Sequence, residues 1–421
     1  MAATIPKPTG PFPVGCCDVM TKAKSLPVDF QPSWLCAQYT DLGSYMTLYY
    51  PANTDLDVTN YERASWIPNL HTSWYCNGLS VNNLRTSWFS FVVKYYQKGV
   101  TQHAFLNAPL IDAQSLKEHA LDDAIKQSDK LPVVIFSHGL SACRTFYSSF
   151  CTELASRGFV VASIEHRDGS SCSSFFIDSD GTHTEVPYFY TDITDDGDEI
   201  KFLLRNMQLL KRSKEISKLM DLLQDLNESP NTIENVLDIK PDLSPFKDRL
   251  DLSNTILMGH SFGAATCLDA LHKDKRLKCG VLLDLWTVPL GPDLYCKMRN
   301  ERPLLVIMTE CWKWKKNCDR LKMYANHQKE GSIETVTLKN AGHIDQTDAT
   351  PIIPRTLSWV FGKDLGPIDF EHGINVQRKL IMEYCTKFLV MSVSGNSNLS
   401  SVNFLSDEYD LHKDFSIGYS M

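Results

Sequence analysis

Residues 255–273 read TILMGHSFGAATCLDALHK, and this stretch decides the fold. The apolar run 255–258 is typical of a buried strand, and 262–273 has the apolar spacing of a helix. The pentapeptide GHSFG, a GxSxG pattern, stands between them at 259–263. Its glycines allow a sharp strand-to-helix turn that leaves a serine hydroxyl exposed. The bare pattern is common by chance, but in this context it predicts Ser261 as a nucleophile.

The neighbouring segments alternate between strand and helix patterns. Residues 132–136 and 159–164 are short β-rich runs, and the stretch between them has a helical pattern closed by Gly158. A strand, a helix and a second strand in this order form a parallel βαβ unit. Residues 45–50 add an early strand, and further strands are expected at 279–283, 304–309 and 333–338.

The remaining segments complete the domain plan. Apolar residues recur at helical spacing over 199–226, which predicts one long helix or two that cross over the sheet. We expect one catalytic domain over 1–392, in which residues 1–30 form an extended Pro- and Gly-rich arm on the surface. Residues 376–389 indicate a closing helix. The Ser- and Asn-rich residues 393–421 are expected to be a flexible polar tail.

The composition argues against nucleic-acid binding. Of the 421 residues, 43% are hydrophobic and 22% are charged, which is typical of a folded globular chain. The formal net charge is −8, and no Lys/Arg-rich stretch alternates with aromatic residues. Nucleic acid is therefore not an expected partner, because nothing supplies the basic field that collects phosphates.

Cysteines and targeting signals indicate the compartment. The thirteen cysteines include no CxxC pair, so we expect reduced and mostly buried thiols. The N-terminal residues lack the apolar core of a secretory signal, and no 18 apolar residues run together. We expect a cytoplasmic protein without a spanning helix, one that can bind membranes peripherally.

A nucleophilic serine needs a base within hydrogen-bond reach. In a sheet of this kind the base comes from the loop after the last strand, and His343 in the segment NAGH at 340–343 has that position. His260 also touches the turn but is better suited to bracing it. His138 and His166 are taken as structural.

Two acidic residues compete to orient His343. In the chain order serine, acid, histidine, Asp284 ends the strand GVLLD and Glu310 ends the strand LLVIMTE one strand later. Topology alone favours Glu310 slightly, because many enzymes of this architecture keep their acid there. From the residues by themselves both candidates stay open.

An attacked carbonyl develops negative charge and needs preorganised donors. One candidate is the backbone N–H of Phe262, and a second is that of Leu140 in the segment SHGLS at 137–141. The alternative is that SHGLS is only a tight turn.

The segment 83–96 reads NLRTSWFSFVVKYY and predicts an amphipathic aromatic helix. Such a stripe often packs against a sheet. The alternative is a helix that lies on a lipid surface. In that case the residues in contact with lipid would be Trp88, Phe89, Phe91 and Val92.

Four stretches resemble the platelet-activating factor acetylhydrolase family, the calcium-independent phospholipases A2 of the plasma and intracellular type II kind. They are GPFPVGCCDVM at 10–20, VVIFSHGLSACRTFYSSFCTELASRGFVVASIEHRDGS at 133–170, GHSFGAAT at 259–266 and LLDLWTVPLG at 282–291. The resemblance covers nearly the whole core and implies an α/β-hydrolase fold, a mostly parallel sheet with helices on both faces.

The resemblance also implies the chemistry. It indicates hydrolysis of the sn-2 ester of glycerophospholipids with acetyl or oxidatively shortened acyl chains, at membrane or lipoprotein-like surfaces, without a metal or an organic cofactor. Through the LDLW context it reverses the topological preference for Glu310. Position by position, it assigns nucleophile, acid and base to Ser261, Asp284 and His343, and the oxyanion donors to Leu140 and Phe262.

The sequence departs from the family pattern in two places. Ala2 follows Met1 where the intracellular type has a glycine for myristoylation, and the Trp- and Lys-rich loop 311–320 also differs. A general carboxylesterase or lipase is the alternative, because the fold hosts many acyl substrates. A catalytically dead binding protein is disfavoured by the intact serine, acid and histidine set.

Overall fold

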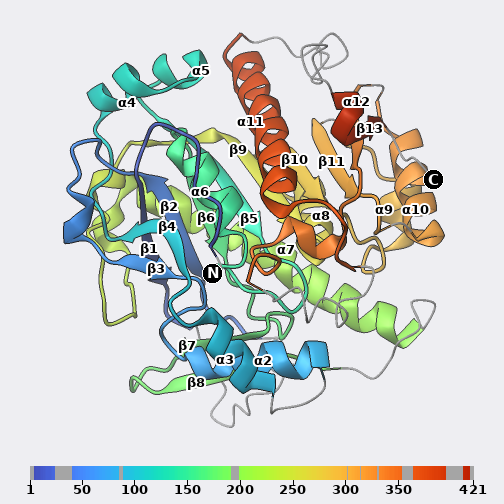
Figure 1. The fold of residues 1–421 in the computed structure, drawn as a ribbon, viewed down its shortest axis with the longest axis horizontal. Coiled ribbons are helices and arrows are strands. Elements are labelled where there is room, and N and C mark those ends of the chain that lie inside the picture. The colour runs from blue at the N-terminus through green and yellow to red at the C-terminus, as the bar shows by residue number, and fades with distance from the viewer. Residues whose placement is uncertain are drawn as a thin grey trace.

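The computed structural model describes residues 4–23, 40–84, 89–190, 199–300, 302–312, 314–329, 331–352, 364–394 and 411–417. Its centre is an eleven-stranded sheet with the strand order β13-β12-β11-β10-β9-β5-β6-β2-β1-β4-β3 (Figure 1). The strands are β1 (Val14–Met20), β2 (Tyr45–Pro51), β3 (Arg63–Ser65), β4 (Thr101–Leu106), β5 (Leu131–Ser137), β6 (Val160–Ile164), β9 (Leu250–His260), β10 (Leu277–Leu283), β11 (Leu304–Thr309), β12 (Ile333–Leu338) and β13 (Phe415–Ile417). A separate hairpin joins β7 (Ser173–Ile177) and β8 (His183–Pro187).

The expected mostly parallel sheet is confirmed. The six strands from β12 to β6 in the sheet order pair parallel, whereas β2 pairs antiparallel with β6 and β13 pairs antiparallel with β12. These parallel strands are rich in apolar residues and buried at their carboxyl ends, as expected for a sheet covered on both faces.

The principal helices are α6 (Ser148–Ser156), α7 (Glu199–Glu228), α8 (Phe262–Lys273) and α11 (Phe370–Ser394). The others are α2 (Thr72–Leu84), α3 (Phe89–Gln97), α4 (Ala113–His119), α5 (Asp123–Lys126), α9 (Pro292–Cys296), α10 (Lys315–Asn326) and α12 (Leu411–Asp414).

The helices cover both faces of the sheet. The connection through α6 leads from β5 to β6, and the one through α8 leads in the opposite direction across the sheet, from β9 to β10. Because both crossovers are right-handed, the two helices lie on opposite faces. Helix α7 packs beside α8, and α11 packs beside α6 (Figure 1). No helix among the described residues is long and apolar enough to cross a membrane.

The structure settles or adjusts four helical predictions. The segment 199–226 is one helix, and the closing helix is longer than the predicted 376–389. The predicted helix between Ser137 and Gly158 begins only at Ser148, because the preceding residues form turns and Ser141 donates its N–H to the carbonyl of Ser170. The aromatic segment 83–96 spans the end of α2 and most of α3, and 85–88 lie outside the described residues.

The N-terminal arm is less superficial than its Pro and Gly content predicts. Residues 14–20 form β1, which lies between β2 and β4 inside the main sheet. Ile5 and Phe12 are also buried. The prediction of an arm that only wraps the surface is therefore wrong for 14–20, where the apolar residues outweigh the nearby prolines.

The predicted flexible tail is wrong for residues 411–417. This segment forms the short helix α12 and the strand β13. Residues 415–417 pair with β12 at the edge of the sheet, and Phe415 is buried. An open sheet edge offers unpaired backbone groups, so a three-residue strand with one large apolar side chain can dock there.

The cysteines follow the sequence prediction. Ten of the twelve cysteines among the described residues are buried. They behave as small apolar side chains in the core.

Candidate active site

Ser261 occupies a strained turn between β9 and α8. Its backbone has φ 56° and ψ −115°, a conformation that residues other than glycine rarely adopt. The end of β5 lies close to this turn, since a Cβ on Gly263 would lie 1.9 Å from the carbonyl oxygen of Ser137. Only glycine fits there. The Ser261 N–H donates to the carbonyl of Leu283 at 2.8 Å, which fixes the turn against the end of β10.

Asp284 and His343 come together at the same edge of the sheet. Asp284 directly follows β10, and His343 stands in the loop after β12. Their hydrogen bond joins His343 Nδ1 and Asp284 Oδ2 at 2.9 Å. The carboxylate is fully buried, whereas the imidazole keeps 14% of its surface exposed. The residues predicted as base and acid are therefore hydrogen-bonded to each other.

Asp284 is fixed by further donors. The N–H and the hydroxyl of Thr309 both donate to the carboxylate, each at 2.6 Å. Glu310, the next residue, lies exposed and accepts the N–H of Asn340 at 2.8 Å. It thus braces the loop that leads to His343. The structure pairs His343 with Asp284 and places Glu310 outside this contact.

Burial sets the protonation of the pair. Removal from water lowers the pKa of His343, so its imidazole is neutral and can accept a proton at neutral pH. Burial also raises the pKa of Asp284, while His260 and the Thr309 donors act in the opposite direction. Trp312 stacks on His343 with ring centroids 3.6 Å apart and contributes to this burial.

His260 braces the site. Its ring centroid lies 4.3 Å from that of His343, and its Nδ1 lies 2.9 Å from the hydroxyl of Tyr147. The same hydroxyl accepts the N–H of Gly139 at 3.0 Å, so Tyr147 links the turn after β9 with the loop after β5. This agrees with the bracing role expected for His260.

Leu140 stands between two backbone amides that already have partners. Gly139 donates to Tyr147, and Ser141 donates to the carbonyl of Ser170 at 2.8 Å. No hydrogen bond of the described residues uses the N–H of Leu140. Phe262 is the first residue of α8, where backbone N–H groups lack partners within the helix. Both amides predicted as oxyanion donors are thus available.

The serine itself is held less tightly. Among the described hydrogen bonds, none joins the Ser261 hydroxyl to His343. Such catalytic contacts are often long without substrate and shorten in the reacting complex. Ser261 as a whole is only 6% exposed.

One group of side chains has the composition of a metal site. Among the described residues, the ligand atoms of His260, Asp284 and His343 lie within 4.8 Å of one another. The hydrogen bond between Asp284 and His343 occupies part of this ligand set. The expectation that no metal is needed stays a prediction.

The sequence reasoning missed two residues of the site. Thr309 donates two hydrogen bonds to the Asp284 carboxylate. Its place at the end of β11, the edge of the sheet where the candidate acids were expected, is the signal that could have indicated it. Trp312 covers the base and lies in the Trp- and Lys-rich loop 311–320. Nothing in that loop signals which of its aromatic residues reaches inward.

Three of the four residues predicted to contact lipid, Phe89, Phe91 and Val92, belong to α3. Phe91 is 73% exposed and Tyr95 is 76% exposed. Lys94 Nζ lies 6.0 Å from the centroid of the Phe91 ring. Trp88 falls outside the described residues, as do the side chains of Phe89 and Val92. We define the α3 patch as Phe91, Lys94, Tyr95 and Tyr96.

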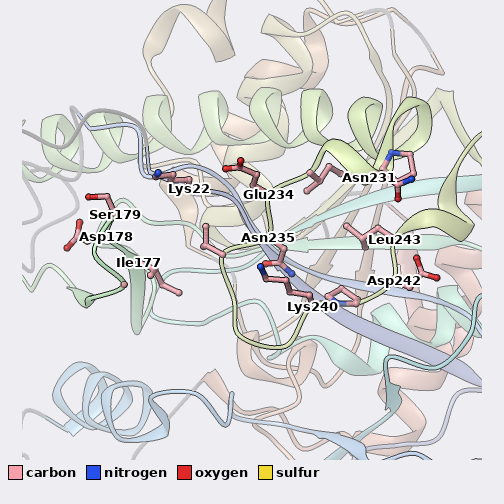
Figure 2. Close-up of a pocket in the computed structure, with 15 residues that line it drawn as sticks. Lys22, Ile177, Asp178, Ser179, Asn231, Glu234, Asn235, Lys240, Asp242 and Leu243 are labelled. Atoms are coloured by element: carbon pink, nitrogen blue, oxygen red, sulfur yellow. The ribbon is translucent and has the colours of Figure 1, made fainter.

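A cavity of about 670 Å³ lies away from the catalytic residues. Figure 2 shows it between the end of β1, the β7–β8 hairpin and the loop 230–243. Its polar rim includes Lys22, Asp178 and Lys240, and Ser261 is absent from its lining. It carries no part of the proposed chemistry.

The parallel sheet, the serine on a strained strand-to-helix turn and the His–Asp pair at the carboxyl ends of the strands define the α/β-hydrolase class. Residues 1–397 match the family model of platelet-activating factor acetylhydrolase, isoform II, and the chain belongs to that family.

Known relatives agree with this assignment. The chain is 32% identical over 389 residues to the platelet-activating factor acetylhydrolase of the dog, Canis lupus familiaris, covering 91% of this chain and 77% of the dog protein. It is 25% identical to a putative phospholipase A2 of Schizosaccharomyces pombe, covering 94% and 95% of the two chains. The expected family resemblance is confirmed, and the chain is placed among hydrolases.

A solved structure supports the fold alone. The ferulic acid esterase from Streptomyces cinnamoneus superposes with a TM-score of 0.61 at 17% identity, and the match covers 99% of each chain. At this identity the shared feature is the arrangement of strands and helices.

Proposed function

We propose that this chain hydrolyses the sn-2 ester of glycerophospholipids whose acyl group is acetyl or oxidatively shortened, as in platelet-activating factor. The observation that carries the proposal is the hydrogen bond between His343 and Asp284 beside the strained turn of Ser261. Membership of the acetylhydrolase family supports the lipid substrate.

The proposed first step is acylation of the enzyme. His343 Nε2 takes the hydroxyl proton as Ser261 Oγ attacks the ester carbonyl. Asp284 holds Nδ1–H in place, so that Nε2 faces the serine, and stabilises the imidazolium that forms. The oxyanion of the tetrahedral intermediate accepts the N–H groups of Leu140 and Phe262, and each such donor is worth roughly 3 kcal/mol.

The second step releases the products. The imidazolium of His343 gives its proton to the leaving glycerol oxygen, and the lyso-lipid departs while the acyl group stays on Ser261. A water molecule then loses a proton to His343 and attacks the acyl-enzyme. Acetate or a short carboxylic acid leaves, and the serine hydroxyl is restored. Every proton transfer uses groups of this chain and water.

The α3 patch is our proposed lipid contact. Phe91 offers an apolar ring, Tyr95 and Tyr96 combine an apolar ring with a polar hydroxyl, and Lys94 adds a positive charge beside them. This combination suits the interface between head groups and acyl chains. Membrane or lipoprotein-like surfaces would thus present the substrate to the enzyme.

The test compares acetyl-labelled platelet-activating factor with a long-chain phosphatidylcholine in excess EDTA, using wild-type protein and Ser261→Ala. We expect acetate release from the first lipid only, and almost none from the variant. If both lipids stay intact while p-nitrophenyl acetate is cleaved in a Ser261-dependent way, a general carboxylesterase replaces the proposed function. Full activity of Ser261→Ala would reject the nucleophile.

A further inference from the structure

Arg212 is a fully buried arginine on α7 that reaches the catalytic edge of the sheet. Its side chain has no exposed surface, and its charge lies 3.5 Å from the equally buried carboxylate of Asp168. A buried charge is costly unless it is paired and hydrogen-bonded, so a specific role is expected for it.

The guanidinium contacts the loop after β5 directly at His138, before Leu140, and is linked through Ser170 to Ser141, after Leu140. Nη1 donates to the carbonyl of His138 at 2.8 Å, two residues before Leu140. Nε donates to the hydroxyl of Ser170 at 2.8 Å, and the carbonyl of Ser170 accepts the N–H of Ser141, directly after Leu140. The Ser170 hydroxyl in turn donates to Asp168, which fixes its direction.

The same guanidinium packs against the other proposed oxyanion donor. Its central carbon lies 4.4 Å from the centroid of the Phe262 ring, within the range of a cation–π contact. Phe262 itself is fully buried. Arg212 is therefore in contact with both segments that carry the donors, although Leu140 lies in the loop after β5 and Phe262 begins α8, far away in the sequence.

We propose that Arg212 is a positioning residue for the oxyanion hole: it sets the distance between the N–H groups of Leu140 and Phe262 and adds a positive potential beside them. This inference rests on the proposed function, since it concerns how that site stabilises its transition state. A donor is effective only when it points at the position that the oxyanion will occupy.

The shape of the guanidinium explains why arginine stands at this position. Its planar fork makes hydrogen bonds in several fixed directions at once, here to His138 and Ser170, while its face lies on the Phe262 ring. Lysine keeps the charge but concentrates its donors at one atom. It cannot hold the two loops and the ring together in this geometry.

The test uses Arg212→Lys and the neutral Arg212→Met, with p-nitrophenyl acetate as a substrate that does not depend on lipid binding. The matched control is Arg378→Lys. Arg378 is a buried arginine on α11 that also donates to backbone carbonyls, those of Ser149, Lys7 and Pro6, and it makes none of the contacts described for Arg212. Circular dichroism and Tm report folding, and rates are given per folded enzyme.

We expect kcat of Arg212→Lys to fall about tenfold or more with little change in KM, and Arg212→Met to fall further, since loss of a whole donor costs roughly 10²–10³ in kcat. A trifluoromethyl ketone, which forms an oxyanion on Ser261, provides the decisive measurement. Its inhibition constant should rise by the same factor by which kcat/KM falls, and Arg378→Lys should change neither.

Two results distinguish a failure of the Arg212 inference from a failure of the proposed function. If Arg212→Lys loses only Tm and matches Arg378→Lys in kcat and in ketone affinity, Arg212 is structural and the inference is wrong. Ser261→Ala in the same assay tests the proposed function by itself. Turnover by that variant would overturn the serine mechanism, whatever the arginine variants do.

Discussion

The indole of Trp312 lies flat against the imidazole of His343, with ring centroids 3.6 Å apart and ring planes inclined by 14°. One face of the base is therefore covered by an apolar ring. This contact adds to the burial that lowers the pKa of His343. Trp312, in the Trp- and Lys-rich loop 311–320, thus directly contacts the base that we propose.

Removal of this cover should change the pH dependence of catalysis. Because the pKa of His343 is lowered, the neutral imidazole and the activity should persist below pH 6.5, the ordinary pKa of histidine. Trp312→Ala exposes the ring, so the acidic limb of kcat/KM should move to higher pH. Trp312→Phe keeps an aromatic cover and should leave the limb near its wild-type position. An identical limb in all three proteins would contradict the role of burial.

The identity of the acid can be tested by two amide substitutions. Asp284→Asn removes the charge that orients His343, so kcat should fall by about 10⁴-fold. Glu310→Gln keeps an oxygen that accepts the Asn340 N–H and should change kcat little. Rates with p-nitrophenyl acetate measure both. The reverse ranking would return the acid to Glu310.

The stability of the protein should depend on Asp348. Burial raises the pKa of this carboxyl from 3.8 to about 6, although Ser148 and Ser149 donate to it. Between these two pH values the folded chain binds more protons than the unfolded chain, so this group lowers the free energy of unfolding as the pH rises. At about 1.4 kcal/mol for each pKa unit, the loss is about 3 kcal/mol.

Asp348→Asn should remove that loss, because the neutral amide needs no proton. Relative to wild type, the variant should gain stability from pH 4 to pH 7, as measured by urea unfolding at each pH. A stability difference that does not change with pH would show that Asp348 is already ionised in the fold at low pH.

The α3 patch predicts a specific loss of lipid binding. Phe91→Ser combined with Tyr95→Ser removes two exposed aromatic rings and should weaken binding to phosphatidylcholine vesicles several-fold, at unchanged turnover of p-nitrophenyl acetate. Val390→Ser is the matched control, since Val390 is half exposed on α11. Vesicle co-sedimentation measures the binding. If Val390→Ser lost as much vesicle binding, the α3 patch would not be a specific lipid contact.

Much of this fold could be predicted from local patterns. The strands near the catalytic edge are short apolar runs, and the GHSFG turn follows from its two glycines. The patterns failed where long-range pairing decides the structure. Residues 14–20 become an inner strand because β2 and β4 lie on either side of them, and 415–417 because β12 offers an edge. The sequence of a segment does not show which distant strands it will pair with.

The site shows the same division. Ser261 and His343 follow from a motif and from chain order, whereas the choice between Asp284 and Glu310 depends on which way each side chain turns after its strand. Asp284 has a positive φ of 41°, a backbone conformation that could not be predicted from the sequence. Arg212 is less visible still, because its contacts connect a helix with two distant loops.

Strand β13 has a consequence for handling the protein. It covers the outer edge of β12, whose backbone N–H and C=O groups would otherwise face solvent. A variant without residues 415–417 would keep every catalytic residue and still expose a ready template for pairing with another molecule. Self-association of folded, active enzyme, rather than loss of turnover, is the failure expected of such a truncation.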